Sequence, residues 1–388
     1  MNVYAKALEE HKKWRGKVEI TSRTQVKNSA ELSLAYSPGV AEPCRQIAAN
    51  PELVWDYTWK GNTIAVVSDG SAVLGLGNIG PAAALPVMEG KAVLFKEFAN
   101  VNAIPLCLNT QDVDEIVRIV KALEPTIAGV NLEDIASPRC FEIEERLKKE
   151  TDMFIFHDDQ HGTAVVTLAG LINALKVVGK GKDVTIVVNG IGAAGAAIIR
   201  ILLEDGYTNI RACGRHGRLV PGDEQNNPAQ EGIAQITNPQ GLRQTLAEAM
   251  QGADVFIGVS AANVVTPEMV KSMNDQPIIM ALANPEPEIS VELALEAGAA
   301  IVATGRSDYP NQINNVLGFP GIFRGALDVR AKDINYAMKI AAANAIANLV
   351  ENPTRECIIP SPFDPRVAPA VADAVAQKAK ETGVAREV

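Results

Sequence analysis

The most informative segment of the chain is Val184-Thr-Ile-Val-Val-Asn-Gly190-Ile-Gly192-Ala-Ala-Gly195. It has the pattern of a buried strand, a Gly-x-Gly-x-x-Gly turn and the start of an alanine-rich helix. In such a turn the first glycine makes the tight bend, the second lets a pyrophosphate approach the backbone, and the third lets the helix pack on the strand. The segment therefore predicts a Rossmann unit in which Gly190, Gly192 and Gly195 line a dinucleotide site. The alternative is a glycine-rich turn in a doubly wound sheet that binds no nucleotide.

The end of the next predicted strand indicates which dinucleotide is preferred. An acidic residue about 20 positions after the turn would bind the ribose 2′-hydroxyl of NAD. Here Gly214 stands at the end of that strand, and Arg215 and Arg218 follow it. Without a carboxylate a 2′-phosphate is not repelled, and an arginine supplies its counter-charge. We therefore predict a preference for NADP, with NAD still possible if both arginines are solvated loop residues.

Short apolar segments with strand character alternate with segments of helical spacing on both sides of this turn. This alternation is typical of α/β proteins whose parallel sheets are covered by helices. The expected strands are residues 63–67, 92–95, 104–108, 126–132, 153–156, 184–188, 210–213, 255–259, 278–282 and 300–303. The expected helices are residues 112–123, 163–178, 196–203, 326–350 and 369–380.

The pattern divides the 388 residues into three parts, within the range of two or three domains that the length suggests. Residues 1–158 are predicted to form an N-terminal α/β domain with a parallel sheet. Residues 159–314 are predicted to form a Rossmann-type, doubly wound NAD(P)-binding domain. Residues 315–388 are predicted to form C-terminal helices that pack back on the first domain.

Composition argues against several classes of protein. Lys and Arg total 36 against 46 Asp and Glu, and a net charge of −10 argues against nucleic acid as the main partner. The long uncharged run 70–88 contains glycines and prolines, which favours a buried loop over a membrane span. The charged N-terminus lacks the apolar core of a signal peptide, and the five cysteines form no C-x-x-C pair. We expect a cytoplasmic protein with reduced thiols.

Carboxylates follow three of the predicted strands. They are Asp69, the pair Glu133-Asp134 and the pair Asp158-Asp159. The carboxyl ends of parallel strands form the ligand crevice of an open sheet, and carboxylates gathered there repel one another unless a cation joins them. Mg²⁺ or Mn²⁺ accepts such oxygen ligands. The sequence therefore predicts a divalent metal site, although each acid taken alone could be a helix cap or a surface residue.

Three further features carry chemistry only in a suitable environment. His157 and His161 could hold zinc, but no third nitrogen or sulfur ligand is evident, so structural histidines are favoured. Tyr36 lies in a loop between helical segments. Lys91 is expected at the start of the apolar strand 92–95, and a buried lysine near a cation would have its pKa lowered and could act as a base.

Taken in order, these segments resemble the malic enzymes of the short bacterial type over essentially the whole chain. The segments that carry the resemblance are Tyr36-Ser-Pro-Gly-Val-Ala-Glu-Pro43, Val67-Ser-Asp-Gly70, Leu74-Gly-Leu-Gly-Asn-Ile-Gly80, Met88-Glu-Gly-Lys-Ala-Val-Leu-Phe95, Asn131-Leu-Glu-Asp134, His157-Asp-Asp-Gln-His-Gly-Thr163, Ala283-Asn-Pro285, Thr304-Gly-Arg-Ser-Asp-Tyr-Pro-Asn-Gln-Ile-Asn-Asn315 and Phe319-Pro-Gly-Ile322.

The resemblance implies roles for individual residues. It implies that the metal is bound by Glu133, Asp134 and Asp159. It also implies catalytic roles for Lys91 as the general base, Asp158 as the carboxylate that holds this lysine, and Tyr36 as the general acid. The substrate carboxylate would be bound by Asn284, Asn314 and Asn315, and Asn284 would also contact the cofactor.

The resemblance further implies an activity. This is the Mg²⁺- or Mn²⁺-dependent oxidative decarboxylation of (S)-malate to pyruvate and CO₂ with reduction of NADP or NAD, together with decarboxylation of oxaloacetate. It also implies a homodimer. Larger family members have a substrate-binding arginine in the segment that reads Ser71-Ala-Val-Leu74 here, so another group must replace it.

Three alternatives are kept. The first is a related two-domain NAD(P)-dependent dehydrogenase that needs no metal. The second is a nucleotide-binding regulator without activity, and the third is a decarboxylase of oxaloacetate without redox chemistry. A regulator is disfavoured because Tyr36, Lys91 and the metal carboxylates are all present.

Overall fold

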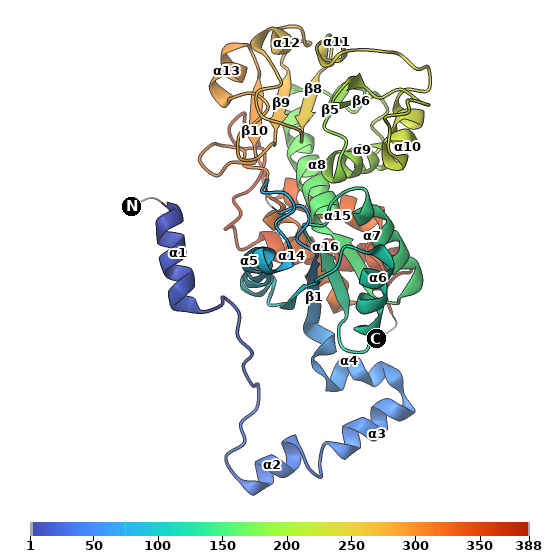
Figure 1. Ribbon diagram of the computed structural model, residues 1–388. Coiled ribbons are helices and arrows are strands. Elements are labelled where there is room, and N and C mark those ends of the chain that lie inside the picture. Colours follow the sequence, from blue (N-terminus) through green and yellow to red (C-terminus); the bar gives the residue numbers. More distant parts are fainter. Residues whose placement is uncertain (1–2, 74, 387–388) are drawn as a thin grey trace.

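The computed structural model describes residues 3–73 and 75–386, so that Leu74, part of two segments quoted above, lies outside the described residues. The chain forms two α/β units, one above the other in Figure 1, with C-terminal helices beside the lower one. The predicted α/β class, with a parallel N-terminal sheet, a Rossmann-type unit and C-terminal helices, is confirmed.

The first sheet has four parallel strands in the order β2-β1-β3-β4. Its strands are β1 (Thr63–Ser68), β2 (Asn102–Cys107), β3 (Gly129–Leu132) and β4 (Phe154–His157). Its connecting helices are α5 (Pro81–Ala99), α6 (Val113–Ala122) and α7 (Arg139–Glu150). Leu132 pairs with His157, so the residues that follow β3 and β4 leave the same edge of the sheet side by side.

The second sheet has six strands in the order β10-β9-β8-β5-β6-β7, parallel except for β7. Its strands are β5 (Ile186–Asn189), β6 (Ile210–Gly214), β7 (Gly217–Arg218), β8 (Val255–Gly258), β9 (Ile278–Ala281) and β10 (Ile301–Thr304). Its helices are α9 (Ala193–Glu204), α10 (Pro228–Thr237), α11 (Leu246–Met250), α12 (Pro267–Lys271) and α13 (Val291–Glu296). The chain passes from β5 to β6 on one side and returns to β8 on the other, which opens a ligand crevice beside β5.

Helix α8 (Asp158–Val178) starts at the end of β4 and runs up into the second unit (Figure 1). It is the one described helix with the length and hydropathy of a membrane span, but it is mostly buried inside the protein, as a core helix is. A short 3₁₀ turn, η3 (Asn315–Leu317), then leads to the tail helices α14 (Phe319–Asp328), α15 (Tyr336–Asn348) and α16 (Val367–Glu381). Helix α15 packs on α8, and α14 and α16 pack on each other and on α5.

The N-terminal segment, residues 3–62, extends from the lower unit. Its first three helices stand away from both units (Figure 1), whereas Trp55 near its end is buried in the core. The segment contains α1 (Val3–Trp14), α2 (Ser29–Ala35), α3 (Ala41–Ala49), η1 (Pro51–Leu53), α4 (Val54–Tyr57) and η2 (Trp59–Asn62). None of α1, α2 or α3 has a buried residue, although the segment carries exposed Val3, Leu8, Ile20 and Leu34. Such apolar exposure is typical of a surface that another chain covers.

Two predicted elements are wrong. Residues 92–95 belong to helix α5, whose buried positions Ala84, Met88, Ala92 and Phe95 have helical spacing that a short strand window overlooks. The single tail helix predicted at 326–350 is interrupted, because Asn335 caps the start of α15 by accepting a hydrogen bond from the backbone of Met338.

Candidate active site

Three carboxylates meet at the carboxyl ends of β3 and β4. Ligand oxygens of Glu133, Asp134 and Asp159 all lie within 4.8 Å of one another. The backbone N–H of Asp134 donates to Asp159 Oδ2 at 2.7 Å, which joins the two strand ends. Carboxylate oxygens at this spacing are suitable ligands for a hard divalent cation such as Mg²⁺ or Mn²⁺. Without a positive charge among them, the three carboxylates would repel one another.

Asp158 and Asp159 form the first turn of helix α8. The partial positive charge of a helix N-terminus stabilises carboxylates there. Gly162, one turn later, leaves room for Asp158, since a Cβ on Gly162 would lie 1.8 Å from Asp158 Oδ1. The helix therefore presents Asp159 to the carboxylate cluster and Asp158 to the neighbouring lysine.

Lys91 projects from the middle of helix α5 and is only 8% exposed. Its Nζ lies 2.6 Å from Asp158 Oδ2 and 2.9 Å from Glu133 Oε1. The ammonium also lies 4.3 Å from the ring centroid of Phe319. Lys91 thus bridges one cluster carboxylate and one carboxylate outside the cluster, with an aromatic ring covering the site.

The carboxylates in contact with Lys91 set the direction of its pKa in the described structure, whereas the lowering expected from a nearby cation stays a prediction. Burial works to lower this pKa, but Asp158 and then Glu133 raise it, and the net pKa lies above the ordinary value for lysine. The expectation of a lowered pKa considered a cation and did not count two carboxylates in direct contact with Lys91. In the described structure the side chain is therefore held as an ammonium.

The three asparagines predicted to bind substrate are placed differently. Asn315 donates from Nδ2 to Asp158 Oδ2 at 2.5 Å and so joins the Lys91 site. Asn284 lies across a cleft of about 460 Å³ that Asp134 and Asp159 also line. Asn314 instead accepts a hydrogen bond from the backbone of Val316 and caps η3, so its carbonyl is already used.

The glycine turn has the geometry that dinucleotide binding requires. A Cβ on Gly190 would lie 2.5 Å from the Val259 carbonyl oxygen, and one on Gly195 would lie 2.0 Å from the Gly190 carbonyl oxygen. A Cβ on Gly192 would meet nothing within 4 Å, because this residue opens toward the crevice at the start of α9. Gly190 and Gly195 therefore permit close packing, and Gly192 leaves space for a ligand.

Comparison with known proteins agrees with this geometry. The family models described as "Malic enzyme, N-terminal domain" and "Malic enzyme, NAD binding domain" match residues 15–148 and 160–380. The bifunctional malic/malolactic enzyme of Bacillus subtilis is 60% identical over 390 residues, covering 100% of this chain and 95% of that protein. The NAD-dependent malic enzyme of Geobacillus stearothermophilus is 57% identical, covering 96% of this chain and 78% of that protein.

This protein belongs to the malic enzyme family. The crystal structure of malic enzyme from Pyrococcus horikoshii superposes with a TM-score of 0.95 at 52% identity, covering 100% of this chain and 92% of that one. The resemblance read from the sequence is therefore confirmed, and the protein is a malic enzyme with a nicotinamide cofactor domain.

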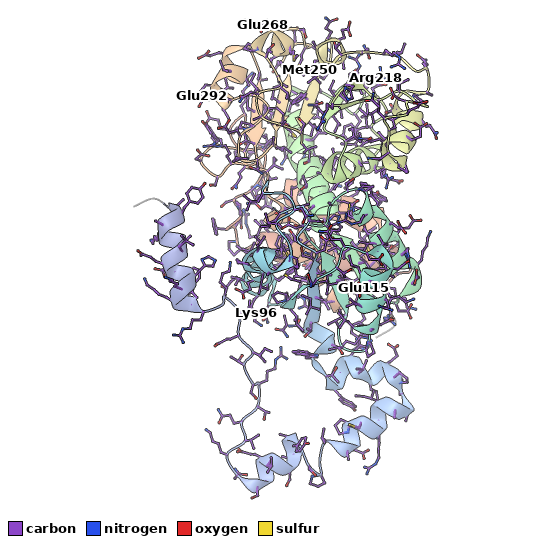
Figure 2. The ribbon with its side chains drawn as sticks, viewed as in Figure 1. Lys96, Glu115, Arg218, Met250, Glu268 and Glu292 are labelled. Atoms are coloured by element: carbon purple, nitrogen blue, oxygen red, sulfur yellow. The ribbon has the colours of Figure 1, made fainter. Side chains whose placement is uncertain are left out.

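The cofactor pocket of this malic enzyme, about 830 Å³, differs in one respect from the prediction. Arg215 is an exposed lining residue that makes no hydrogen bond or ion pair with the described residues. Arg218, labelled in the upper unit in Figure 2, donates to Gln244 Oε1 at 2.7 Å and to the Thr237 carbonyl at 3.0 Å. Its guanidinium is thus engaged within the protein, which leaves Arg215 as the freer of the two predicted arginines.

Arg243 is a lining residue of this pocket that sequence reasoning missed. Its side chain is 77% exposed and approaches a carboxylate, that of Asp223, only at 3.7 Å. It lies 28 positions beyond Arg215 in the chain, so no local pattern near the glycine turn could have indicated it.

Tyr36 is the one predicted catalytic residue that the fold does not bring to the others. It is 69% exposed and follows α2, at the lower end of the view, whereas α5 with Lys91 lies in the body of the molecule (Figure 1). Within one copy of this malic enzyme, Tyr36 and Lys91 therefore lie in separate places.

Two residues that orient the carboxylates were also missed. Asn131, fully buried in β3, donates to Glu133 Oε2 at 2.7 Å. His157 Nε2 lies 3.2 Å from Asp159 Oδ2. Such contacts fix the direction of metal ligands, and their signal in the sequence is only that each precedes an acid by two residues.

Asp69 and the two histidines do not belong to the carboxylate cluster. Asp69 accepts hydrogen bonds from Ser71 and pairs with Arg139 at 3.0 Å. His161 pairs with Glu144 at 2.8 Å, away from His157. The predicted group of three acidic strand ends is therefore reduced to two, and the described residues bring no zinc-type set of nitrogen and sulfur ligands together.

Proposed function

We propose that the protein catalyses the metal-dependent oxidative decarboxylation of (S)-malate to pyruvate and CO₂, with NADP preferred over NAD. The observation that supports this proposal best is the contact of Lys91 with both Asp158 and Glu133, directly beside the carboxylate cluster. A base, a cation site and a dinucleotide crevice then adjoin one another, as a reaction that removes a proton, a hydride and CO₂ requires.

The residues divide the chemistry among them. When bound, a cation held by Glu133, Asp134 and Asp159 would polarise the C2 oxygen of malate as a Lewis acid, and NADP⁺ would accept the C2 hydride. Lys91 must first lose its own proton, which the positive charge of the cation would favour. It then accepts the proton of the C2 hydroxyl, and Asp158 pairs with the ammonium that results. The C3–C4 bond then breaks, CO₂ leaves and its electron pair stays on C3 of the enolate.

The last step is a proton transfer to C3, which we assign to Tyr36. Because Tyr36 lies on the exposed N-terminal segment, we propose a homodimer in which this segment reaches the partner's site. Decarboxylation of added oxaloacetate follows from the same site, because it needs the cation and Tyr36 but no hydride transfer.

The NADP preference rests on the cofactor pocket. Gly214 places no carboxylate where a 2′-phosphate would lie, and exposed Arg215 and Arg243 line the same pocket. Relatives of this chain include malic enzymes named for NAD and malic enzymes named for NADP. One of the latter, the NADP-dependent malic enzyme of Rhizobium meliloti, is 50% identical, and the match covers 98% of this chain and 52% of that longer protein.

Initial rates with malate, Mn²⁺ and either NAD or NADP test the proposal. We expect pyruvate and reduced cofactor in equal amounts, a higher kcat/KM with NADP, and loss of turnover with a chelator. Turnover that survives the chelator would favour a metal-free dehydrogenase, and decarboxylation without cofactor reduction would favour a simple decarboxylase. Lactate is measured in parallel, because the relative from Bacillus subtilis is named a malic/malolactic enzyme.

A further inference from the structure

A second cavity, of about 590 Å³, lies outside the cofactor pocket and the carboxylate cleft. Residues of α7, the start of α8, α9, the start of α10 and α15 line it. Nothing in the proposed reaction uses this cavity, yet its wall contains an unusual group of charges.

Lys339, on α15, lines the cavity and is only 2% exposed. Its ammonium makes no hydrogen bond or ion pair with the described residues, and its nearest aromatic neighbour is the ring of Tyr336, 4.7 Å away. Lys91, the other buried lysine described above, is by contrast paired with two carboxylates. A buried ammonium without a counter-charge is costly, typically by several kcal/mol.

Two acids, Glu144 and Asp333, act on Lys339, but both lie beyond ion-pair distance of its ammonium and pair with other groups. Glu144 Oε1 lies 2.8 Å from His161 and 3.2 Å from Lys148, and its Oε2 accepts from Gln160 at 3.0 Å. Burial and then the positive charge of Lys148 hold the pKa of Lys339 well below its ordinary value. An anion beside Lys339 would stabilise its ammonium against both burial and the positive charge of Lys148, and would raise its pKa.

Two further features describe the ligand. Exposed Arg200 lines the cavity without a carboxylate partner in the described structure and could hold an anion from a second side. The remaining wall includes the rings of Phe141 and Tyr336 and the prolines 138 and 228, which suit an apolar or aromatic body. A bare inorganic ion would leave that part of the cavity unused.

We propose that this cavity binds a small organic anion, with its phosphate or carboxylate between Lys339 and Arg200 and a flat apolar body against Phe141 and Tyr336. The first turns of helix α8, which carry Asp158 and Asp159, also contribute Gln160 and His161 to the wall of this cavity.

A chain of polar contacts connects the cavity with the proposed metal site. Gln160 Nε2 donates to Glu144 Oε2 at 3.0 Å and to His157 Nδ1 at 2.7 Å. With Nδ1 accepting, the imidazole carries its hydrogen on Nε2, which faces Asp159 Oδ2 at 3.2 Å. We expect an anion in the cavity to change the affinity of Asp159 and its cluster for the cation, an effect that rests on the proposed metal site.

Calorimetric titration with phenyl phosphate, benzoate and inorganic phosphate, in excess NADP to fill the dinucleotide pocket, tests the site. We expect one of the aromatic anions to bind and inorganic phosphate to bind at least tenfold more weakly. Lys339→Met should weaken binding at least tenfold, whereas Lys271→Met, which removes an exposed lysine on α12, should not. Absence of binding by the wild type, or equal binding by Lys339→Met, would overturn the proposal.

A misfolded variant is recognised from its melting temperature. Methionine replaces the lysine with an apolar chain of similar length, so Lys339→Met should melt at or above the wild-type temperature. A large loss of melting temperature would mean that Lys339 is structural and would overturn its assignment as an anion ligand.

Mn²⁺ titration with and without the bound anion tests whether the cavity is coupled to the carboxylate cluster. We expect the Mn²⁺ affinity to change at least twofold in the wild type and to stay constant in Gln160→Leu, which breaks the chain. An unchanged affinity in the wild type would overturn the effector role. Failure of Mn²⁺ to bind at all would instead contradict the proposed function, while anion binding would still be measured independently.

Discussion

Lys91 and Asp158, 67 positions apart in the chain, form a buried ion pair in which Nζ lies 2.6 Å from Oδ2. The pair joins the middle of helix α5 to the first turn of helix α8. Desolvation of both charges is repaid only because Glu133 and Asn315 provide further close contacts. This contact fixes the position of the group that we propose as the base.

Lys91→Ala should therefore lower kcat for malate oxidation by about 10²- to 10⁴-fold, the usual contribution of a general base. Mn²⁺ and NADP binding should remain close to wild type in calorimetric titration. Lys96→Ala, which removes an exposed lysine of the same helix, is the matched control and should keep its activity. Wild-type turnover by Lys91→Ala would contradict the assignment of the base.

The carboxylate cluster predicts stabilisation by a divalent cation. Mn²⁺ at 100 times its Kd should add about 2.7 kcal/mol to the free energy of unfolding and raise the melting temperature by several degrees. Asp159→Asn should lose most of this increase. Glu145→Gln, at an exposed position of α7, should keep it, and an equal increase in both variants would place the cation elsewhere.

The two exposed arginines of the cofactor pocket predict selective effects on NADP. Arg215→Ala and Arg243→Ala should each lower kcat/KM for NADP about tenfold, because a charge-assisted contact with the 2′-phosphate is lost. The kcat/KM for NAD should change little. Arg366→Ala, in the exposed turn before α16, controls for net charge. Equal losses with both cofactors would argue against recognition of the 2′-phosphate.

The exposed position of Tyr36 predicts complementation between subunits. Tyr36→Phe and Lys91→Ala should each be inactive in malate turnover alone. Mixed after dissociation and reassembly, they should recover about a quarter of wild-type activity, because half of the dimers then contain one complete site. Recovery that stays at the background level would mean that Tyr36 serves the site of its own chain.

Asp254 predicts a pH dependence of stability away from the active site. Its carboxylate accepts hydrogen bonds from Lys180 at 2.8 Å, from the backbone of Thr185 at 2.8 Å and from Asn274 at 3.0 Å. Burial works to raise its pKa, but these contacts prevail and lower it. The stabilisation is therefore complete above the unfolded pKa of about 3.9 and is lost as the pH falls through the lower folded value.

Asp254→Asn should accordingly destabilise the protein by about 1 to 2 kcal/mol at pH 7. The difference from wild type should shrink as the pH falls below about 4, when the wild-type carboxyl also loses its charge. Denaturant unfolding at several pH values measures the difference in unfolding free energy between Asp254→Asn and the wild type. A difference that stays constant down to pH 3 would mean that shape, and not charge, sets the contribution of Asp254.

Local sequence patterns predicted much of the fold and part of the site. The Gly190–Gly195 turn is recognisable because its glycines meet steric demands set within a few residues of one another. Glu133 and Asp159 could be predicted to meet because parallel strands deliver their carboxyl ends to one edge of a sheet. Both arguments depend only on short-range spacing and on the direction of the strands.

Other features depended on contacts between distant segments. Lys91 lies in a helix because α5 packs across the sheet and against α14, and two carboxylates from other elements set its charge. Arg218 is engaged by its own domain, while Arg243 reaches the same pocket from a distant loop. Lys339 is buried without a hydrogen bond or ion pair to the described residues because α15 packs over α8.

The sequence by itself therefore determined most strands of the two sheets, the glycine turn and the acids at the strand ends, since periodicity and turn chemistry are local. Only the tertiary structure decided which charges are paired, which arginine faces the cofactor pocket and where Tyr36 lies. Those outcomes depend on burial and on distances between segments far apart in the chain, and no local pattern encodes them.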